Sequence, residues 1–281
     1  MATIVNQSNE LWEIVGINHN DRSDYQLRID APELVYSRNV TALIRVTTDG
    51  RLYNTVAANQ YIEFDDGQDQ RDFKSVVTDY LDTNFLALKQ NGDLYSGRLN
   101  HNDTEVTEFK LIDSEVEWIT TGSNYYNIIS VKGEVITTYF SGEVNKTVNL
   151  LENEVVVDVY PGVIVTDIRF IAANMSVKRS GRLIGCGIRI DHKTEPYLII
   201  AEEVDGKLSI HFEDLLINRW LSSYKNPFLI DIHSECPWID VVTLDNNNPC
   251  LLNEVGNTVE LLPNGVFDFT KIPSYILCPE S

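Results

Sequence analysis

The chain has 281 residues, of which 43% are hydrophobic and 23% charged, a balance typical of a folded globular protein that excludes a disordered chain. Its formal net charge of −20 repels phosphate backbones and anionic lipid surfaces, so we expect neither nucleic acid nor a membrane as a partner. No stretch approaches the ~20 apolar residues of a membrane-spanning helix, and residues 1–16 lack the basic start and apolar core of a signal peptide. We therefore expect a cytoplasmic or otherwise intracellular protein, and the richness in Asn, Ile, Asp and Tyr suits a host-cell or virion protein of an AT-rich organism.

In chain order, the first predicted elements are a strand within residues 11–21 and then a series of similar hairpins. Each hairpin joins two apolar strands through a glycine, the residue that adopts the positive φ of a tight turn most readily. The turn glycines are Gly50 in "ALIRVTTDGRLYNT", Gly92 in "FLALKQNGDLYSGRLN", Gly133 in "NIISVKGEVITT" and Gly181 in "NMSVKRSGRLIGCG". They lie 42, 41 and 48 residues apart, which indicates a repeated unit.

The later units are less regular. Further hairpins are expected at Asp205-Gly206, around Asn246–Asn248, and at Asn264-Gly265. The best helix-like stretch is 212–224, "FEDLLINRWLSSY", and helical periodicity is otherwise scarce.

A period near 40 with one central hairpin per unit is typical of a β-propeller, in which each blade has four short strands. We therefore predict an all-β fold: a single β-propeller domain over residues 1–281, with six or seven four-stranded antiparallel blades. Residues 11–21 resemble only the second half of a unit. The N-terminal strand is therefore expected to complete the last blade, near "KIPSYILC" (271–278), and so to close the ring.

The units resemble repeats of the regulator of chromosome condensation family, whose hairpins read roughly "AL-x-x-x-G-x-(V/L)-(Y/W)" and continue to a Gly and an Asn. The matching residues here are Ala87-Leu88, Gly92, Leu94-Tyr95, Gly97 and Asn100, with Leu52-Tyr53 after Gly50 and Leu183-Ile184 after Gly181. The likeness is strongest from Thr41 to Gly187. The chain departs from the family in having only 15 glycines and no "GQLG" segment. The resemblance implies a propeller and, as a family activity, guanine-nucleotide exchange on a Ran-like small GTPase.

No catalytic, cofactor or metal constellation emerges from the sequence. The cysteines lack C-x-x-C spacing and are expected to be free thiols, and His19 and His101 recur in matching "NHND" segments as loop features. His192 and His233 lie next to or near an aspartate, without an accompanying nucleophile. The densest acidic segment, "EFDDGQDQRD", is either a solvated loop or a contact for a basic partner. Its acidic residues are Glu63, Asp65, Asp66, Asp69 and Asp72.

Three functions remain open from the sequence. The first is a non-catalytic protein-interaction module whose acidic surface binds a basic protein partner. The second is the exchange activity that the resemblance implies, with a small GTPase as partner. The third is an enzymatic or sugar-binding use of the central channel. We expect no cofactor, and the sequence does not indicate an oligomeric state.

Overall fold

The structure, a computed structural model, describes the chain in segments between residues 2 and 268. They are 2–5, 11–14, 25–36, 38, 44–55, 60–64, 70–78, 84–99, 105–121, 128–140, 142–172, 175–189, 197–214, 228–229, 238–244, 248–253, 258–261 and 267–268. All regular structure in these segments is β-strand, as the sequence predicts. None of their elements is a helix long and apolar enough to cross a membrane.

Within the described residues the strands form seven sheets, which follow one another along the chain. The first holds β1 (Ala2–Val5), β2 (Leu11–Ile14) and β3 (Tyr25–Leu27), and the second β4 (Ile44–Val46), β5 (Leu52–Asn54) and β6 (Gln60–Tyr61). The third holds β7 (Glu63–Phe64), β8 (Phe73–Thr78), β9 (Asn84–Lys89), β10 (Leu94–Leu99) and β11 (Glu105–Asp113). The fourth holds β12 (Trp118–Thr121), β13 (Ile128–Lys132), β14 (Val135–Phe140) and β15 (Glu143–Asn149).

The remaining sheets have four strands each. The fifth holds β16 (Val156–Tyr160), β17 (Val163–Thr166), β18 (Arg169–Ala172) and β19 (Met175–Lys178). The sixth holds β20 (Arg182–Arg189), β21 (Tyr197–Val204), β22 (Lys207–Asp214) and β23 (Phe228–Leu229), and the seventh β24 (Trp238–Leu244), β25 (Asn248–Asn253), β26 (Thr258–Leu261) and β27 (Phe267–Asp268).

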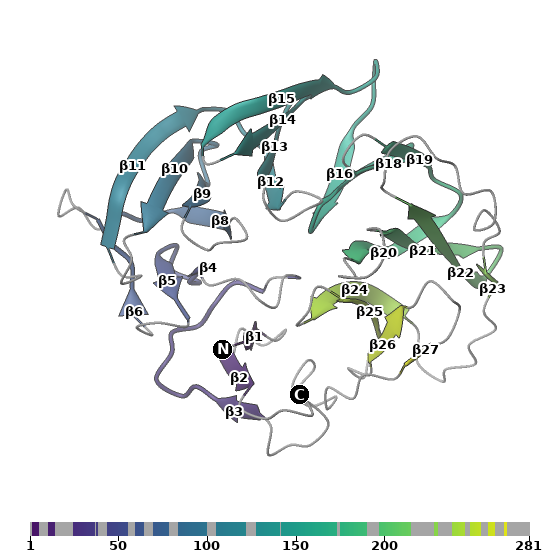
Figure 1. Cartoon of the computed structure of the whole chain (residues 1–281), viewed down its shortest axis with the longest axis horizontal. Coiled ribbons are helices and arrows are strands. Elements are labelled where there is room, and N and C mark those ends of the chain that lie inside the picture. The colour runs from purple at the N-terminus through teal and green to yellow at the C-terminus, as the bar shows by residue number, and fades with distance from the viewer. Residues whose placement is uncertain are drawn as a thin grey trace.

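The sheets are arranged radially about a common centre, and this gives the molecule a propeller-like architecture (Figure 1). The strand that comes first in each antiparallel series lies nearest the centre. These inner strands contact one another in sequence order, from β4 through β8, β12, β16 and β20 to β24. Strand pairing is antiparallel throughout except where the short β7 pairs in parallel with β11, so the third sheet has five strands instead of the expected four.

The hydrophobic cores lie between neighbouring sheets, because alternate side chains of each strand point toward the next sheet. Ile44 and Leu52 of the second sheet pack in one cluster with Phe85 and Val106 of the third. Equivalent clusters join the third to the fourth sheet and the fourth to the fifth, and a larger cluster joins the fifth, sixth and seventh. Successive sheets are therefore held together by small cores between them.

Two of the turn glycines link their sheet to the next. Gly50 and Gly92 have φ of 81° and 90°, and the carbonyl of each accepts a hydrogen bond from an N–H at or just before the start of the next inner strand. Phe73 donates to Gly50 at 3.0 Å, and Val116 donates to Gly92 at 2.9 Å. Gly133 also has a positive φ, 52°, in the turn between β13 and β14. The spacing of about 42 residues in the sequence thus corresponds to a repeated contact between sheets.

A lysine accompanies two of these turns in the same geometry. Lys89 Nζ donates to Gln70 Oε1 at 3.0 Å, and Lys132 Nζ donates to Asp113 Oδ1 at 2.9 Å. In both pairs the partner lies 19 residues earlier, on the segment that leads into an inner strand. The repetition shows that the third and fourth sheets are built on one plan.

Gly181 differs from the other turn glycines, because the hairpin expected there is not formed. Strand β19 pairs with β18, and β20 pairs with β21, so Gly181 lies on the connection between two sheets. A glycine is needed here because the backbone of Glu203 approaches closely, and a Cβ at Gly181 would clash with the Glu203 carbonyl oxygen. The hairpin of the sixth sheet instead turns at Asp205 and Gly206, both with positive φ.

The sequence predicts that the N-terminal strand completes the last blade, and this concerns the pairing of strands at the two ends of the chain. In the described residues, β1 pairs with β2 within the N-terminal sheet, and β24 to β27 form their own sheet. Residues 271–278, which were expected to receive the N-terminal strand, lie outside the described residues. Of the helix-like stretch, residues 212–214 end β22 and the others lie outside the described residues.

Candidate functional site

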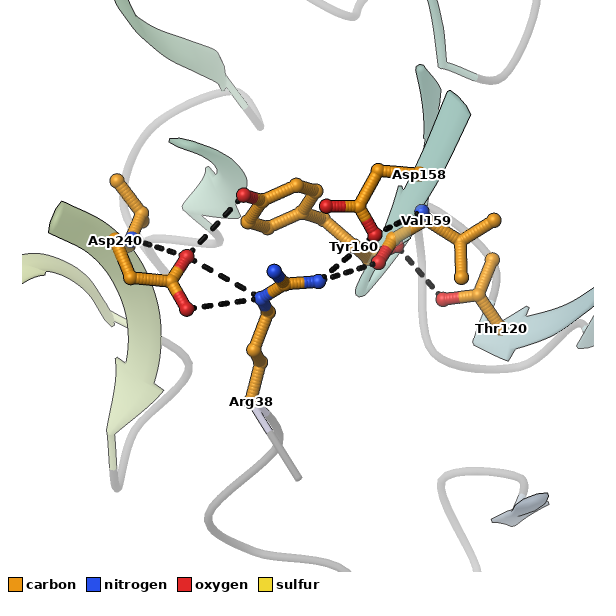
Figure 2. Close-up of polar contacts among 7 residues, drawn as sticks. Arg38, Thr120, Asp158, Val159, Tyr160 and Asp240 are labelled. Carbon is orange, nitrogen blue, oxygen red and sulfur yellow. Dashed lines mark hydrogen bonds and ion pairs between the residues drawn. The ribbon is translucent and has the colours of Figure 1, made fainter. Parts of the chain in front are cut away.

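Four inner strands carry the same irregularity, a shift of register after their first residues. The shifts fall between Phe73 and Ser75 in β8, Val156 and Asp158 in β16, Leu183 and Gly185 in β20, and Trp238 and Asp240 in β24. A bulge of this kind re-aims the following side chain. In β16 and β24 the residue after the bulge is an aspartate, and both aspartates face the same arginine (Figure 2).

Arg38 binds these two aspartates from the segment that precedes β4. Its Nη1 donates to Asp158 Oδ1 at 2.9 Å, and its Nε donates to Asp240 Oδ2 at 3.0 Å. Figure 2 shows the guanidinium lying between β16 and β24, which belong to sheets separated by the sixth. One cationic side chain thus ties the N-terminal part of the chain to two inner strands, and the three side chains together carry a net negative charge.

Tyr160 completes this cluster. The guanidinium carbon of Arg38 lies 4.1 Å from the centre of the Tyr160 ring, and the Tyr160 hydroxyl donates to Asp240 Oδ1 at 3.1 Å. Thr120 of β12 donates to the Tyr160 carbonyl at 2.7 Å and so connects the cluster to the fourth sheet. A cation over an aromatic face and a charge-assisted hydrogen bond are both favourable, especially away from water.

Burial and charge together decide the protonation of these groups. Burial lowers the pKa of the Arg38 guanidinium, but the electrostatic interactions with Asp240, Tyr160 and Asp158 and the hydrogen bond to Asp158 outweigh it and raise that pKa above its ordinary value. Burial, followed by the charge of Asp240, raises the pKa of Tyr160, which therefore remains a hydrogen-bond donor. Burial also raises the pKa of Asp240 against the opposing effect of Arg38. The cluster is thus a guanidinium between two carboxyl groups, with a neutral phenol as the fourth member.

A cavity of about 850 Å³ lies beside the cluster and is lined by Arg38 and Asp158. Its apolar wall includes Leu88, Val116 and Trp118. Its other charged lining residues are Lys74, Glu115 and Glu117, of which Glu115 has a side chain 87% exposed. A smaller cavity of about 290 Å³ adjoins Arg38, Tyr160 and Thr120. The mixed apolar and carboxylate lining is suited to a ligand that presents both a hydrocarbon stem and positive charge.

No described residue of the acidic segment noted in the sequence contributes to the cavity lining: two of its acidic residues lie elsewhere, and the other three are outside the described residues. Glu63 lies exposed in β7, and Asp72 is exposed with a φ of 69° beside the Gly50 turn. Asp65, Asp66 and Asp69 lie outside the described residues, and no group of three or more His, Cys, Asp and Glu side chains that could hold a metal ion is found within the described part of the chain.

Among the histidines, only His211 falls within the described residues, where its Nε2 lies 3.8 Å from Glu202 Oε2. Cys186 and Cys250 are both buried and form no disulfide, and burial raises the pKa of the Cys186 thiol well above its ordinary value. Cys236 and Cys278 lie outside the described residues.

Arg38, Asp158 and Tyr160 were not found by sequence reasoning, and neither was Asp240. A signal for the aspartates was present: "VVDVY" and "WIDVV" both place an aspartate between apolar residues of a strand. An ionisable residue in such a position either breaks the alternation or has a buried partner. The arginine partner is 120 residues from Asp158 and 202 from Asp240, and nothing local marks it.

The proteins similar to this chain are solved structures of low sequence identity. No family model and no curated protein matches the chain. Among solved structures, a functionally unknown protein from Desulfotomaculum acetoxidans DSM 771 is 12% identical, with 84% of this chain and 77% of that chain covered and a TM-score of 0.49. The WD40 domain of SCAP from fission yeast is 8% identical (68% and 50% covered, TM-score 0.43), and Kluyveromyces lactis Hsv2 is 11% identical (80% and 72% covered, TM-score 0.44). Because these TM-scores are below 0.5, the description of the architecture rests on the chain's own sheets.

Proposed function

We propose that this chain is a protein-interaction module without chemistry of its own, which takes a basic segment of a partner in the cavity of about 850 Å³ beside the Arg38 cluster. The observation that carries the proposal is the lining of that cavity, where Glu115, Glu117 and Asp158 stand beside an apolar wall. The net charge of −20 supports it, because such a field raises the encounter rate with a basic surface.

The balance of charge in the cavity favours a cation over an anion. Arg38 is already paired with Asp158 and Asp240, so its positive charge is offset by two carboxyl groups. Among the described lining residues Lys74 is then the remaining cation, against the two carboxylates of Glu115 and Glu117. Lys132 Nζ approaches Glu115 at 3.8 Å but binds Asp113 more closely, at 2.9 Å. A lysine or arginine side chain of a partner can lay its hydrocarbon stem along Trp118 and its charge against the glutamates.

We also propose the number of blades, the single-domain organisation and the family resemblance. We take each of the seven sheets as one blade and the chain as one domain, supported by the succession of contacts between inner strands and by the reach of Arg38 from residue 38 to residue 240. The likeness to regulator of chromosome condensation repeats stays a proposal, supported by the similar hairpins at Gly50 and Gly92.

A binding experiment tests the proposed site. Fluorescence anisotropy with a labelled nona-arginine peptide is measured against wild type and against a Glu115→Gln, Glu117→Gln double variant. The matched control is Glu143→Gln with Glu152→Gln, which removes the same charge from exposed positions that do not line the cavity. The first variant is expected to weaken binding about tenfold and the control less than about twofold, since each local charge pair contributes far more than the distant field.

Two results would overturn this proposal. Equal weakening by both variants would show that charge is sensed over the whole surface and not at the cavity. Faster release of labelled GDP from Ran in the presence of the protein would replace the interaction-only function with the exchange activity that the family resemblance implies.

A further inference from the structure

A group of exposed apolar side chains lies outside the cavity, where the fourth sheet passes into the fifth. We name it the corner patch: Leu151, Val155, Val157 and Ile168, exposed by 52%, 59%, 46% and 42%. Val155 and Ile168 come from different parts of the chain and are brought together by the backbone, since Asp167 donates its N–H to the Val155 carbonyl at 2.9 Å. Several exposed apolar side chains brought together on a highly charged protein are a mark of an interaction site.

The corner patch rests on a rigid support. Beneath the loop from Leu151 to Val155, the Glu154 side chain is fully buried, and its two oxygens accept Arg169 Nε and Nη2 at 2.7 Å each. The same carboxylate accepts the Leu151 N–H at 2.8 Å and the Thr166 hydroxyl at 2.7 Å. Four hydrogen bonds to one carboxylate hold the loop in a single shape. A surface ordered in advance loses little conformational entropy when a partner binds.

Positive charge borders the corner patch on the side of Ile168, whereas the exposed carboxylates of Asp167, which accepts the Val155 N–H at 3.0 Å, and of Glu152 lie on its other side. The densest basic segment, with Lys178, Arg179 and Arg182, runs past it on the connection from β19 to β20. Arg179 donates its N–H to the Ile168 carbonyl at 3.0 Å and its Nη1 to the Thr166 carbonyl at 3.0 Å, so its cation lies beside the patch. Lys178 is exposed and has no ion pair with another described residue.

We propose that the corner patch is a second docking surface, which binds an extended peptide segment of a partner that combines aliphatic side chains with aspartate or glutamate. The aliphatic side chains cover Val155 and Ile168, and the carboxylates face Lys178 and Arg179. A second copy of the chain is a poorer occupant, because it carries the whole charge of −20 and is repelled far more strongly than a short peptide with one or two carboxylates. With the cavity taking a basic segment, the molecule would hold two partners of opposite charge.

Selection from a phage-displayed library of random dodecapeptides tests the corner patch directly. Peptides selected on wild type are expected to be enriched in Leu, Ile or Val together with Asp or Glu. Val155→Ser with Ile168→Ser is expected to weaken these peptides at least about tenfold in anisotropy, as is typical when the centre of an interface is removed. Lys178→Gln is expected to weaken them severalfold and to reduce the salt dependence.

The control variant is Leu111→Ser, which removes an equally exposed apolar side chain, 52%, from strand β11. Because all substituted side chains are exposed, each variant is expected to keep the thermal unfolding midpoint of wild type within about 2 °C. Selected peptides that are basic, or that bind the Val155, Ile168 variant as tightly as wild type, would overturn the proposal. So would sedimentation showing a wild-type dimer that Val155→Ser with Ile168→Ser dissociates. Binding of nona-arginine at the cavity is unaffected by either result and is judged separately.

Discussion

Asp158 and Asp240 occupy the same place on two inner strands, each directly after a bulge, and each carboxylate accepts the N–H of the following valine at 2.8 Å. That local hydrogen bond fixes both carboxyl groups so that their remaining lone pairs are directed at one guanidinium. Two bulges with the same local hydrogen bond thus place both carboxyl groups at the Arg38 guanidinium.

Removing the guanidinium tests this relationship. Arg38→Ala leaves two partly buried carboxyl groups facing each other across an empty space, and we expect it to lower the free energy of unfolding by about 2 kcal/mol, since the cluster is only partly shielded from water. Urea unfolding followed by tryptophan fluorescence measures the loss. Arg38→Lys is expected to recover only part of it, because a point charge cannot bridge both carboxylates as the planar fork does.

Chemical rescue distinguishes loss of the Arg38 ion pairs from a general loss of packing. Millimolar methylguanidinium should raise the thermal unfolding midpoint of Arg38→Ala by occupying the space between Asp158 and Asp240, with no comparable effect on wild type. If the additive changed both midpoints alike, the two carboxyl groups would not form a guanidinium site.

The hydrogen bonds to the Glu154 carboxylate predict that the stability of the fold depends on pH. The hydrogen bond from Arg169, with those from Leu151 and Thr166, lowers the pKa of Glu154 from 4.5 to about 2 against the effect of burial. A carboxyl group whose pKa is lowered by folding stabilises the fold above the pKa of the unfolded chain, and this contribution disappears as the pH falls through the folded value. It amounts to about 3 kcal/mol, which is expected to be present at pH 6 and mostly lost by pH 2.

Urea midpoints of wild type and Glu154→Gln at pH 6 and pH 2.5 measure this difference. The gap between the two proteins should narrow strongly at the lower pH. The neighbouring Glu152→Gln, at an exposed position, should leave the midpoint at pH 6 nearly unchanged. A gap that stayed constant across this range would mean that the Glu154 charge does not contribute to stability.

Two turn glycines differ in their surroundings and should differ in their tolerance of alanine. At Gly92, φ is 90° and an added Cβ would lie 3.1 Å from the Glu115 Cα, whereas at Gly133, φ is 52° and no atom lies within 4 Å. We expect Gly92→Ala to cost about 2 kcal/mol and Gly133→Ala about 1 kcal/mol, since left-handed backbone alone accounts for the second. Denaturant unfolding of the pair gives the comparison, and equal costs would argue against the contact between the Gly92 turn and the next sheet.

Gly97 makes room for an aromatic ring on the neighbouring strand. A Cβ there would lie 2.1 Å from the Phe85 Cζ, so Gly97→Ala forces the ring to move and is expected to cost about 2 kcal/mol. Phe85→Leu removes the ring and should make the same Gly97→Ala change nearly neutral. A double-mutant cycle measures this coupling, and additive effects would show that the two residues do not compete for space.

The strands and their first three turns could be predicted because their causes are local. Alternating apolar residues favour strands, and Gly50, Gly92 and Gly133 all take the positive φ that a tight turn needs. The same reasoning misassigned Gly181, where the glycine is required by the approach of the Glu203 backbone, a neighbour in space and not in a hairpin. The hairpin between β17 and β18 escaped prediction since its turn, Asp167-Ile168, has no glycine.

By itself, then, the sequence determined an all-β chain of repeated hairpins with a strongly negative net charge, because periodicity, turn residues and net charge are properties of short stretches or of the whole composition. The tertiary structure alone decided that Arg38 lies between Asp158 and Asp240, that β7 joins the outer edge of the third sheet, and that Val155 and Ile168 share one exposed corner. The physical reason is distance along the chain. Ion pairs between residues more than a hundred positions apart depend on how the sheets are arranged about a centre, and no local pattern encodes that arrangement.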